Sequence, residues 1–450
     1  MQRRDFLRGA AALSAASLLT RAQAATRPPN IILLLTDDMG FGDVGCYGGR
    51  FAPTPNLDKL AAEGTRFCDY YSASPICSPS RTGLTTGMYP GRWRITSYLQ
   101  TRAGNAACGQ ADFLDPAAPS LARCLREAGY ATGHFGKWHM GGGRDVRDAP
   151  KFAAYGFDEH ASTWESPEPH PDITSTDWIW APSDKVKRYD RTAFFVDQTL
   201  DFMRRHPDQP CYVNLWPDDA HTPFVPSDDG LSHYTDGPLE QRKFSAVLDE
   251  YDKQVGRLMA GLRALGQADN TLVLFTSDNG ALPTFGGRRS DGLRGSKLGC
   301  YEGGIRMPFI AHWPGHVPAG RVDDQAVLHA TDLFPTLCAV AGAKLPAQAK
   351  LDGSDQSAAL LGRGQSGERT LFFEYGRNNT SFAYPQGRDR SPRLAVRQGK
   401  WKLLCNEDGG GVELYDLVAD RNETTNLAEK EPAVTSRLRE LVTTWRKELP

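Results

Sequence analysis

The stretch Asn30-Ile-Ile-Leu-Leu-Leu-Thr36, followed directly by Asp37-Asp38, decides the fold class of this chain. Five consecutive apolar residues leave no polar face, which is typical of a strand buried on both sides of a sheet. The pattern continues along the chain, with strands predicted at 130–135, 211–216 and 271–276 and helices at 55–63, 121–128, 191–205 and 239–265. Helices that alternate with apolar strands predict an α/β fold: a mostly parallel sheet sandwiched by helices.

From about residue 367 the pattern changes to short, partly alternating strands at 369–375, 391–405 and 412–417, with a closing helix at 431–448. These elements predict a small antiparallel sheet with one helix. We therefore expect a catalytic α/β domain over 25–366 and a small C-terminal α+β subdomain over 367–450. The segment 141–190 is rich in Gly, Pro, Asp and Trp and is expected to form loops over a site.

The first 24 residues have the pattern of an export signal peptide. Arg3 and Arg4 precede a short apolar run, and Ala22-Gln23-Ala24 supplies a small-residue cleavage site. The paired arginines resemble a twin-arginine signal and predict a periplasmic protein that uses the export machinery. The alternative, an anchor helix, would need an apolar run of about 20 residues. A formal net charge of −2 argues against nucleic acid as a partner and, with the short apolar runs, against stable membrane insertion.

Polar residues follow two of the predicted strands. Asp37-Asp38 ends the first, and Asp278-Asn279 follows the strand at 271–276. The carboxyl ends of parallel strands are where doubly wound sheets bind ligands. Adjacent carboxylates repel each other unless a cation joins them, and oxygen ligands favour Ca²⁺ or Mg²⁺ over zinc. Taken separately, either pair could equally be turn chemistry.

The strongest local signal is Ser74-Pro-Ile-Cys77-Ser-Pro79-Ser-Arg81-Thr-Gly-Leu-Thr-Thr-Gly87. It predicts a helix that begins near Cys77, where the helix dipole and free amides favour an anion, with Arg81 one turn further on. From residue types alone, Cys77 could be a thiolate nucleophile or a buried cysteine. The nine cysteines contain no CxxC pair, which argues against a zinc ribbon or a thioredoxin-like motif.

Cys77-x-Pro79-Ser-Arg81 resembles the modification motif of the type I, formylglycine-dependent sulfatases, members of the alkaline-phosphatase-like superfamily. Further landmarks of that family occur in its order: Asp37-Asp38, the segment 129–139 ending in Lys137-Trp-His139, His221-Thr-Pro, Ser277-Asp278-Asn279-Gly280, Arg294-Gly-Ser-Lys297 and Glu302-Gly-Gly. The resemblance runs from about residue 28 to the C-terminus. One departure is Thr85, where the family usually has an apolar residue, and we interpret it as a packing variation.

The resemblance implies a sulfuric ester hydrolase (an arylsulfatase-like sulfatase) that cleaves sulfate monoesters. A maturation enzyme would convert Cys77 to formylglycine, whose hydrated gem-diol attacks sulfur and later expels sulfate. One Ca²⁺ ion would be bound by Asp37, Asp38, Asp278, Asn279 and an oxygen of the modified Cys77. By the same resemblance, the catalytic residues besides Cys77 are Arg81, Lys137, His139, His221 and Lys297. His139 would position the diol and act in the elimination. The other four would neutralise the sulfuryl oxygens and the leaving oxygen. His221 or Lys297 would also protonate the leaving group.

The loop segment also bears on the substrate. Trp164, Glu165, His170, Trp178 and Trp180 suggest a pocket that stacks and hydrogen-bonds a sulfated sugar or polysaccharide fragment. The alternative is that these tryptophans only pack, since Trp is usually largely buried. The alternative activity is that of a phosphonate monoester or phosphodiester hydrolase of the same superfamily, which can share formylglycine and the scaffold.

Overall fold

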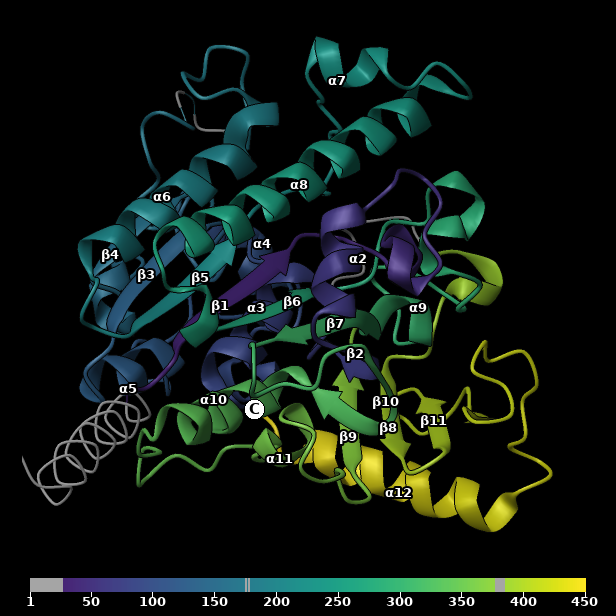
Figure 1. Ribbon diagram of the computed structural model, residues 1–450. Coiled ribbons are helices and arrows are strands. Elements are labelled where there is room, and N and C mark those ends of the chain that lie inside the picture. Colours follow the sequence, from purple (N-terminus) through teal and green to yellow (C-terminus); the bar gives the residue numbers. More distant parts are fainter. Residues whose placement is uncertain (1–26, 175, 177–178, 377–384) are drawn as a thin grey trace, which may run out of the picture.

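A computed structural model describes residues 27–174, 176, 179–376 and 385–450 of the chain (Figure 1). The predicted export signal, residues 1–24, lies outside the described residues. The main feature is an eight-stranded sheet in the order β4-β3-β5-β1-β6-β7-β2-β8. Its strands are β1 (Asn30–Thr36), β2 (Thr65–Tyr71), β3 (Ala131–Gly136), β4 (Glu159–Ser162), β5 (Cys211–Trp216), β6 (Thr271–Ser277), β7 (Arg306–His312) and β8 (Arg321–His329).

The sheet is mostly parallel, as predicted. Strand β1 lies at its centre, pairs in parallel with β5 and β6, and is buried at every position. Strand β7 runs antiparallel to both of its neighbours, β6 and β2. Because β1 and β6 are in register from Asn30 and Thr271 to Thr36 and Ser277, the residues that follow them emerge side by side at one edge.

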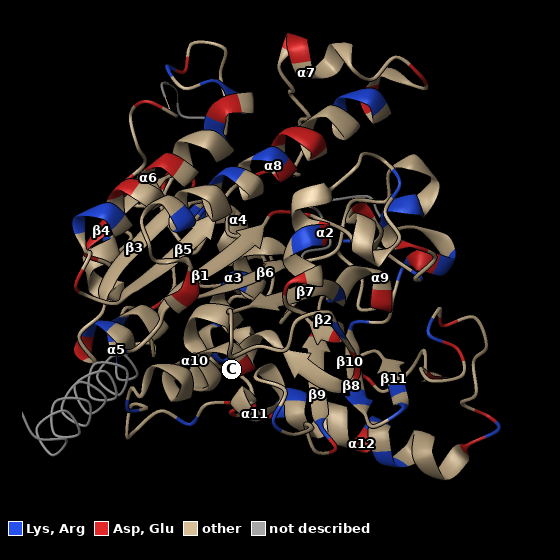
Figure 2. Ribbon diagram, viewed as in Figure 1, with Lys and Arg blue, Asp and Glu red and all other residues tan. Residues whose placement is uncertain are grey.

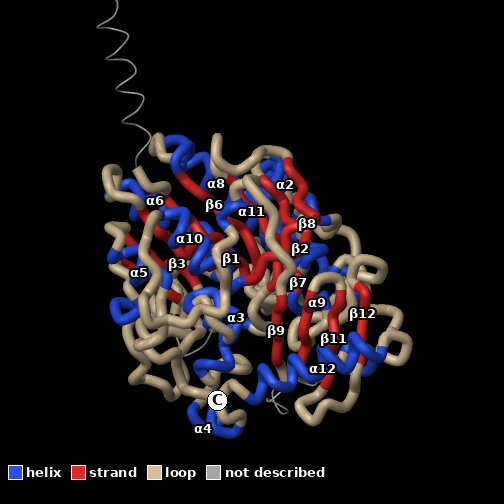
Figure 3. Tube along the Cα trace, turned by 90° about the horizontal axis from the view of Figure 1, so that it is seen from below, coloured by secondary structure: helices blue, strands red, loops and turns tan. Residues whose placement is uncertain are grey.

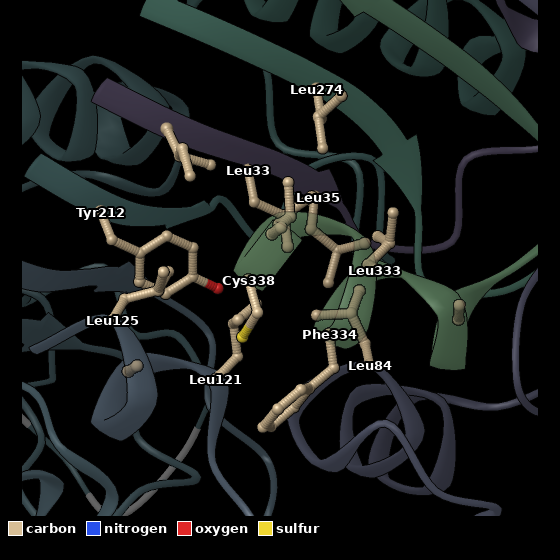
Figure 4. Close-up of a cluster of buried hydrophobic side chains, with 14 of the residues drawn as sticks. Leu33, Leu35, Leu84, Leu121, Leu125, Tyr212, Leu274, Leu333, Phe334 and Cys338 are labelled. Carbon is tan, nitrogen blue, oxygen red and sulfur yellow. The ribbon is translucent and has the colours of Figure 1, made fainter. Parts of the chain in front are cut away.

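Helices cover both faces of this sheet, so the predicted sandwich is confirmed (Figure 1). One face is covered by α2 (Pro55–Ala62), α6 (Arg191–Arg205) and α8 (Leu239–Ala264), and the other by α3 (Cys77–Thr86), α5 (Leu121–Glu127) and α10 (Leu333–Ala341). Figure 4 shows the second face: Leu33 and Leu35 of β1 lie among Leu84, Leu121 and Leu333. The chain's central strand is therefore packed by apolar side chains on both sides.

Smaller helices occupy the connections of the main sheet, and they comprise α4 (Arg102–Ala107), α7 (Asp228–Ser232), α9 (Glu302–Ile305) and α11 (Ser357–Leu360). Acidic and basic residues alternate along the outer helices α6 and α8 in Figure 2. No helix among the described residues is both long enough and apolar enough to cross a membrane.

The second sheet has the order β12-β11-β10-β9 and is antiparallel throughout, as predicted. Its elements are β9 (Thr370–Glu374), β10 (Leu394–Gln398), β11 (Trp401–Cys405), β12 (Glu413–Asp416) and the closing helix α12 (Pro432–Lys447). Helix α12 packs against β10 and β11, and Figure 3 shows this unit beside the main sheet. Tyr71 and Ile305 share a buried cluster with Phe373 and Leu404, so the two sheets are joined by apolar contact.

The expectation that 141–190 consists only of loops over a site is wrong in part. Residues 159–162 form the edge strand β4, which pairs with β3. Phe152, Tyr155 and Phe157 are buried in the main core against Trp138. An edge strand of four residues gives too short an alternation to be distinguished from a turn in the sequence. The remainder of the segment does lie over the cavity described below.

Candidate active site

Cys77 is the first residue of α3, and every residue of that helix is buried. Ile76 precedes it in an extended conformation, so the chain turns sharply into the helix at Cys77. Burial raises the pKa of the Cys77 thiol to about 12, although Lys137 and Lys297 lower it. An unmodified Cys77 is therefore a neutral thiol at physiological pH, which argues against the thiolate nucleophile considered from the sequence.

Three carboxylates and an amide meet at the carboxyl ends of β1 and β6. Asp37, Asp38, Asp278 and Asn279 are all buried. Asp278 Oδ1 accepts a hydrogen bond from the Asp38 backbone N–H at 3.2 Å, and Asn279 Nδ2 donates to Asp38 Oδ1 at 2.7 Å. The parallel register of the two strands explains why residues 240 positions apart make these contacts.

Three cations neutralise this group from different parts of the chain. Lys137, directly after β3, lies 2.7 Å from Asp37 Oδ2, and Lys297 lies 2.7 Å from Asp38 Oδ2. Arg81 Nη2 lies 2.7 Å from Asp278 Oδ2. Burial alone would raise the pKa of Asp37, but the neighbouring cations hold it well below its usual value. Burial raises the pKa of Asp278 to about 7, because Arg81 compensates for it only in part.

The same group has the composition of a hard-metal site. Asp37, Cys77 and Asp278 can place one ligand atom each within 4.8 Å of one another, as can Asp38, Cys77 and His221. Within the described part of the chain, Asp37 Oδ1 and Asn279 Oδ1 are buried without a hydrogen-bond partner. Unsatisfied buried oxygens are costly, and a bound cation would satisfy them. The residues therefore fit an oxygen-liganded divalent ion.

Two histidines border the cavity that contains Cys77. His139 follows Lys137 in a left-handed backbone conformation, with φ of 54°. Burial lowers the pKa of His139 to about 3, against the opposing effect of Glu165. His221 Nδ1 donates to its neighbour's carbonyl, Thr222 O, at 2.6 Å, and its Nε2 lies 3.6 Å from Asp38 Oδ2. Burial also lowers the pKa of His221, so both imidazoles are neutral at pH 7.

A cavity of about 570 Å³ opens beside Cys77. Its lining brings together the predicted Asp37, Lys137, His139, His221 and Lys297, and it adds an apolar and aromatic wall that includes Ile76, Tyr98, Trp164, Trp180 and Pro223. Of the proposed sugar-contacting residues, Trp164, Glu165 and Trp180 do line this cavity.

His170 is the exception, and its assignment to the pocket is wrong. It is absent from the cavity lining and packs against Phe194 of α6 instead. Its carbonyl and Nδ1 stabilise the local turn through Thr174 and Asp172, so the residue serves the loop and not the cavity. Trp178 lies outside the described residues.

The residues of the cavity wall that sequence reasoning missed include Tyr98, Arg144 and Arg188. Arg188 Nη1 lies 2.8 Å from Asp218 Oδ1 and 3.1 Å from Asp219 Oδ1. Asp218-Asp219 comes after β5, much as Asp37-Asp38 comes after β1. The same signal, paired carboxylates after an apolar strand, would have identified Asp218-Asp219, the partners of Arg188. Tyr98 and Arg144 lie in loops, and no periodic pattern marks them.

Thr85, the departure noted in the sequence, is 5% exposed on α3, and its Oγ1 lacks a hydrogen-bond partner among the described residues. The neighbouring Leu84 packs into the main core.

Two family models match the chain. The model described as Sulfatase covers residues 29–343, and that of the C-terminal part of N-sulphoglucosamine sulphohydrolase covers 296–448. The N-acetylgalactosamine-6-sulfatase of Sus scrofa is 38% identical over 408 residues, which cover 83% of this chain and 73% of that protein. The N-acetylgalactosamine-6-O-sulfatase of Bacteroides thetaiotaomicron is 29% identical over 507 residues, covering 93% of both chains.

Solved structures share the whole fold. The crystal structure of Ps i-CgsB in complex with k-i-k-neocarrahexaose superimposes with a TM-score of 0.79 at 26% identity and covers 94% of both chains. The phosphonate monoester hydrolase of Agrobacterium radiobacter reaches a TM-score of 0.66 at 21% identity, covering 94% of this chain and 96% of that one, which shows likeness of fold alone.

Proposed function

This chain belongs to the sulfatase family, and we propose that it hydrolyses sulfate monoesters of a sulfated sugar with formylglycine at position 77 and one Ca²⁺ ion. The observation that carries the proposal is that Cys77, Lys137 and Lys297 line one cavity, while the buried Arg81, one turn further along α3, pairs with Asp37 and Asp278. Three buried cations at this point suit a tetrahedral oxyanion, and they remain charged because neighbouring carboxylates raise the pKa of each of them.

The ion would be bound by Asp37, Asp38, Asp278, Asn279 and an oxygen of the modified Cys77. Asp37 Oδ1 and Asn279 Oδ1 accept no hydrogen bond among the described residues, and Asp37 Oδ1 has only Arg81 Nη2 at 3.4 Å, which supports this ligand set. When bound, Ca²⁺ supplies Lewis-acid polarisation of the sulfate group. Lys137 and Lys297 hold Asp37 and Asp38 through their other oxygens, so the ligands are oriented before the ion arrives.

The remaining roles follow from charge and position. Arg81, Lys137 and Lys297 stabilise the negative charge that develops on the sulfuryl oxygens. Lys297 is both cationic and cavity-facing, so it can donate a proton to the leaving oxygen. His221 is neutral, and its Nδ1–H donates to Thr222 O, so Nε2 is unprotonated and can accept a hydrogen bond from a hydroxyl of the substrate. His139, also neutral, is suited to accept a proton from the group at position 77.

A sugar is the substrate class that best suits the wall of the cavity. Tyr98, Trp164 and Trp180 offer aromatic surfaces in the cavity that Lys137 and Lys297 also line. Aromatic rings of this kind stack on the C–H faces of sugar rings while polar groups at the rim bind hydroxyls. The relatives named above act on N-acetylgalactosamine 6-sulfate by name, and the Ps i-CgsB structure contains an oligosaccharide.

The proposal is tested by assaying purified protein on matched sulfate and phosphonate esters of 4-nitrophenol and on a panel of sulfated sugars that includes N-acetylgalactosamine 6-sulfate. We expect hydrolysis of the sulfates and little turnover of the phosphonate. A preference for the phosphonate would instead support the phosphonate or phosphodiester hydrolase activity. Release of sulfate from the aryl ester but from none of the sugars would contradict the sugar assignment.

We further propose that residues 1–24 direct a folded enzyme to the periplasm by the twin-arginine route. Oxidation of Cys77 by a maturation enzyme must precede folding, because Cys77 is only 2% exposed in the folded chain. Replacing Arg3 and Arg4 by lysines should leave active enzyme in the cytoplasm. Normal export of that variant, or loss of all activity, would contradict this route.

A further inference from the structure

Glu165 contacts His139 through both its main chain and its side chain. The backbone N–H of His139 donates to the carbonyl oxygen of Glu165 at 2.9 Å. The Glu165 carboxylate places Oε2 3.2 Å from His139 Nε2. The carbonyl oxygen of Leu99 lies 3.2 Å from the same ring nitrogen. Two acceptors therefore face one nitrogen of His139.

This arrangement fixes the tautomer of the imidazole. A carbonyl and a carboxylate can only accept hydrogen bonds, so Nε2 must carry the hydrogen. The other nitrogen, Nδ1, is buried and has no hydrogen-bond partner among the described residues. In a neutral ring Nδ1 is then the unprotonated nitrogen, and His139 lines the cavity that contains Cys77. The ring is thus prepared to accept a proton at Nδ1.

The carboxylate of Glu165 is itself held in place. Its second oxygen, Oε1, accepts a hydrogen bond from Arg144 Nη2 at 2.7 Å, and the guanidinium of Arg144 lies over the Trp164 ring, 5.1 Å from its centroid. With Oε1 bound to Arg144 and Oε2 facing His139, both oxygens of Glu165 are engaged within the protein. The Glu165 side chain is 8% exposed, so its first role is to orient His139 and not to bind a sugar hydroxyl.

A glycine run makes this close approach possible. Gly141, Gly142 and Gly143 all have positive φ. A Cβ atom on Gly142 would lie 2.2 Å from the backbone carbon of Ser166, and one on Gly143 would lie 3.0 Å from the carbonyl oxygen of Trp164. The backbone after His139 therefore lies directly on the segment that carries Glu165, and only glycine permits this contact.

We propose that Glu165 is the positioning residue for His139, which it holds as the Nε2–H tautomer so that Nδ1 serves as the proton acceptor in the cavity that residue 77 also lines. This inference rests on the proposed function. When His139 takes up a proton at Nδ1, the negative charge of Glu165 stabilises the resulting imidazolium. That contribution matters in a pocket where burial and the cations Lys137, Arg81 and Arg144 all oppose a positive ring.

Two substitutions test the proposal kinetically. Glu165→Ala removes both the charge and the acceptor, and we expect kcat on 4-nitrophenyl sulfate to fall about 100-fold while KM stays within about threefold. Glu165→Gln keeps a similar shape and one acceptor oxygen, so it should recover part of the lost kcat. Glu168→Gln is the matched control, because Glu168 belongs to the same segment but contacts Lys151 and His160 outside the cavity lining.

A spectroscopic measurement tests the same claim without turnover. The protein is prepared with ¹⁵N-labelled histidine side chains, and the NMR signals of His139 are identified by their loss in His139→Gln. These signals should show a protonated Nε2 and an unprotonated Nδ1. In Glu165→Ala they should shift toward a mixture of tautomers, while in Glu168→Gln they should not change. A melting temperature for each variant shows that it is folded.

The outcomes are distinct. An Nδ1–H tautomer in the wild type, or a rise in KM with unchanged kcat in Glu165→Ala, would overturn the proposal and return Glu165 to a substrate-binding role. A wild-type protein that hydrolyses no sulfate ester would refute the proposed function, yet the tautomer would still decide whether Glu165 controls His139.

Discussion

Two buried groups of lysines and carboxylates in this molecule have nearly the same ingredients but different surroundings. The catalytic cluster consists of Asp37, Asp38, Asp278, Arg81, Lys137 and Lys297. The junction cluster consists of Lys402 on β11, Glu302 at the start of α9, and Glu423 after β12. Lys402 Nζ lies 2.9 Å from one oxygen of each glutamate, and Glu423 Oε2 accepts the Glu302 backbone N–H at 2.7 Å. The junction cluster thus links α9, which lies in a connection of the main sheet, to the small antiparallel sheet.

The difference lies in whether the charged groups also face a cavity. All three side chains of the junction cluster have 0% exposure, and its lysine pairs with both glutamates. In the catalytic cluster, by contrast, Asp37, Lys137 and Lys297 also line a cavity. A buried ion pair therefore indicates function only when its charges also face a space that a ligand can enter. The junction cluster, by contrast, should serve stability alone.

The largest effect is expected for Cys77→Ala. Removing the side chain that becomes the nucleophile should lower kcat/KM by about 10⁴-fold or more, with little change in melting temperature. Cys211→Ala, at a buried cysteine on β5, should retain activity and serves as the control. Substantial turnover by Cys77→Ala would contradict covalent catalysis at this position.

Lys402→Met should act on stability and not on catalysis. It removes the cation that the buried Glu302 and Glu423 share and leaves Glu302 paired with Arg306, which we expect to lower the free energy of unfolding by about 3–5 kcal/mol. The folded fraction should keep its kcat/KM. Lys137→Met is the matched variant in the catalytic cluster, and there kcat/KM should fall about 10²–10³-fold. Urea unfolding followed by assay of the folded protein distinguishes the two clusters, and a reversal of these effects would refute the comparison.

Calcium should stabilise the folded protein through the catalytic cluster and not through other carboxylates. Adding Ca²⁺ at 100 times its dissociation constant to chelator-treated protein should raise the free energy of unfolding by about 2.7 kcal/mol. Asp37→Asn should remove most of that gain, whereas Asp352→Asn, at a carboxylate paired with Arg92, should not. An equal gain in both variants would place the ion elsewhere.

The smallest effect concerns pH. Burial, reinforced by Glu302 and only partly offset by Lys402, raises the pKa of Glu423 to about 7 from 4.5. Between these values the folded state holds a proton that the unfolded state has released, so stability should fall by roughly 2 kcal/mol as pH rises from 5 to 7. Glu423→Gln should flatten this slope in a series of unfolding measurements. A slope of the same size in the variant would exclude Glu423 as its source.

The sequence was sufficient for the parts of the fold that repeat a local pattern. The apolar strands β1, β5 and β6, the helices between them and the four short strands at the C-terminus all have a period or a buried run that predicts them. Strands β2, β7 and β8 were not predicted. The direction of β7, antiparallel between β6 and β2, is set by these partners, and nothing within Arg306–His312 encodes it.

The candidate site was predicted to the extent that its residues belong to motifs. Asp37, Cys77, Lys137, His221 and Lys297 come from separate motifs, and the structure brings them to one cavity. Glu165 was named from the sequence only as a sugar-contacting residue, not as a partner of His139, and Lys402 was not named at all. Lys402 occupies an alternating position in a short strand, where lysine is ordinarily exposed, and its burial follows only from two glutamates that are 100 and 21 residues away.

The most direct test of the account is the mass of the tryptic peptide Phe67–Arg81 from protein purified out of its own host. Conversion of Cys77 to formylglycine lowers that mass by about 18 Da. The account predicts the lighter peptide in active protein. An unmodified thiol at Cys77 in protein that still hydrolyses sulfate esters would contradict the account. Since the buried thiol is neutral, a different group would then have to act as the nucleophile.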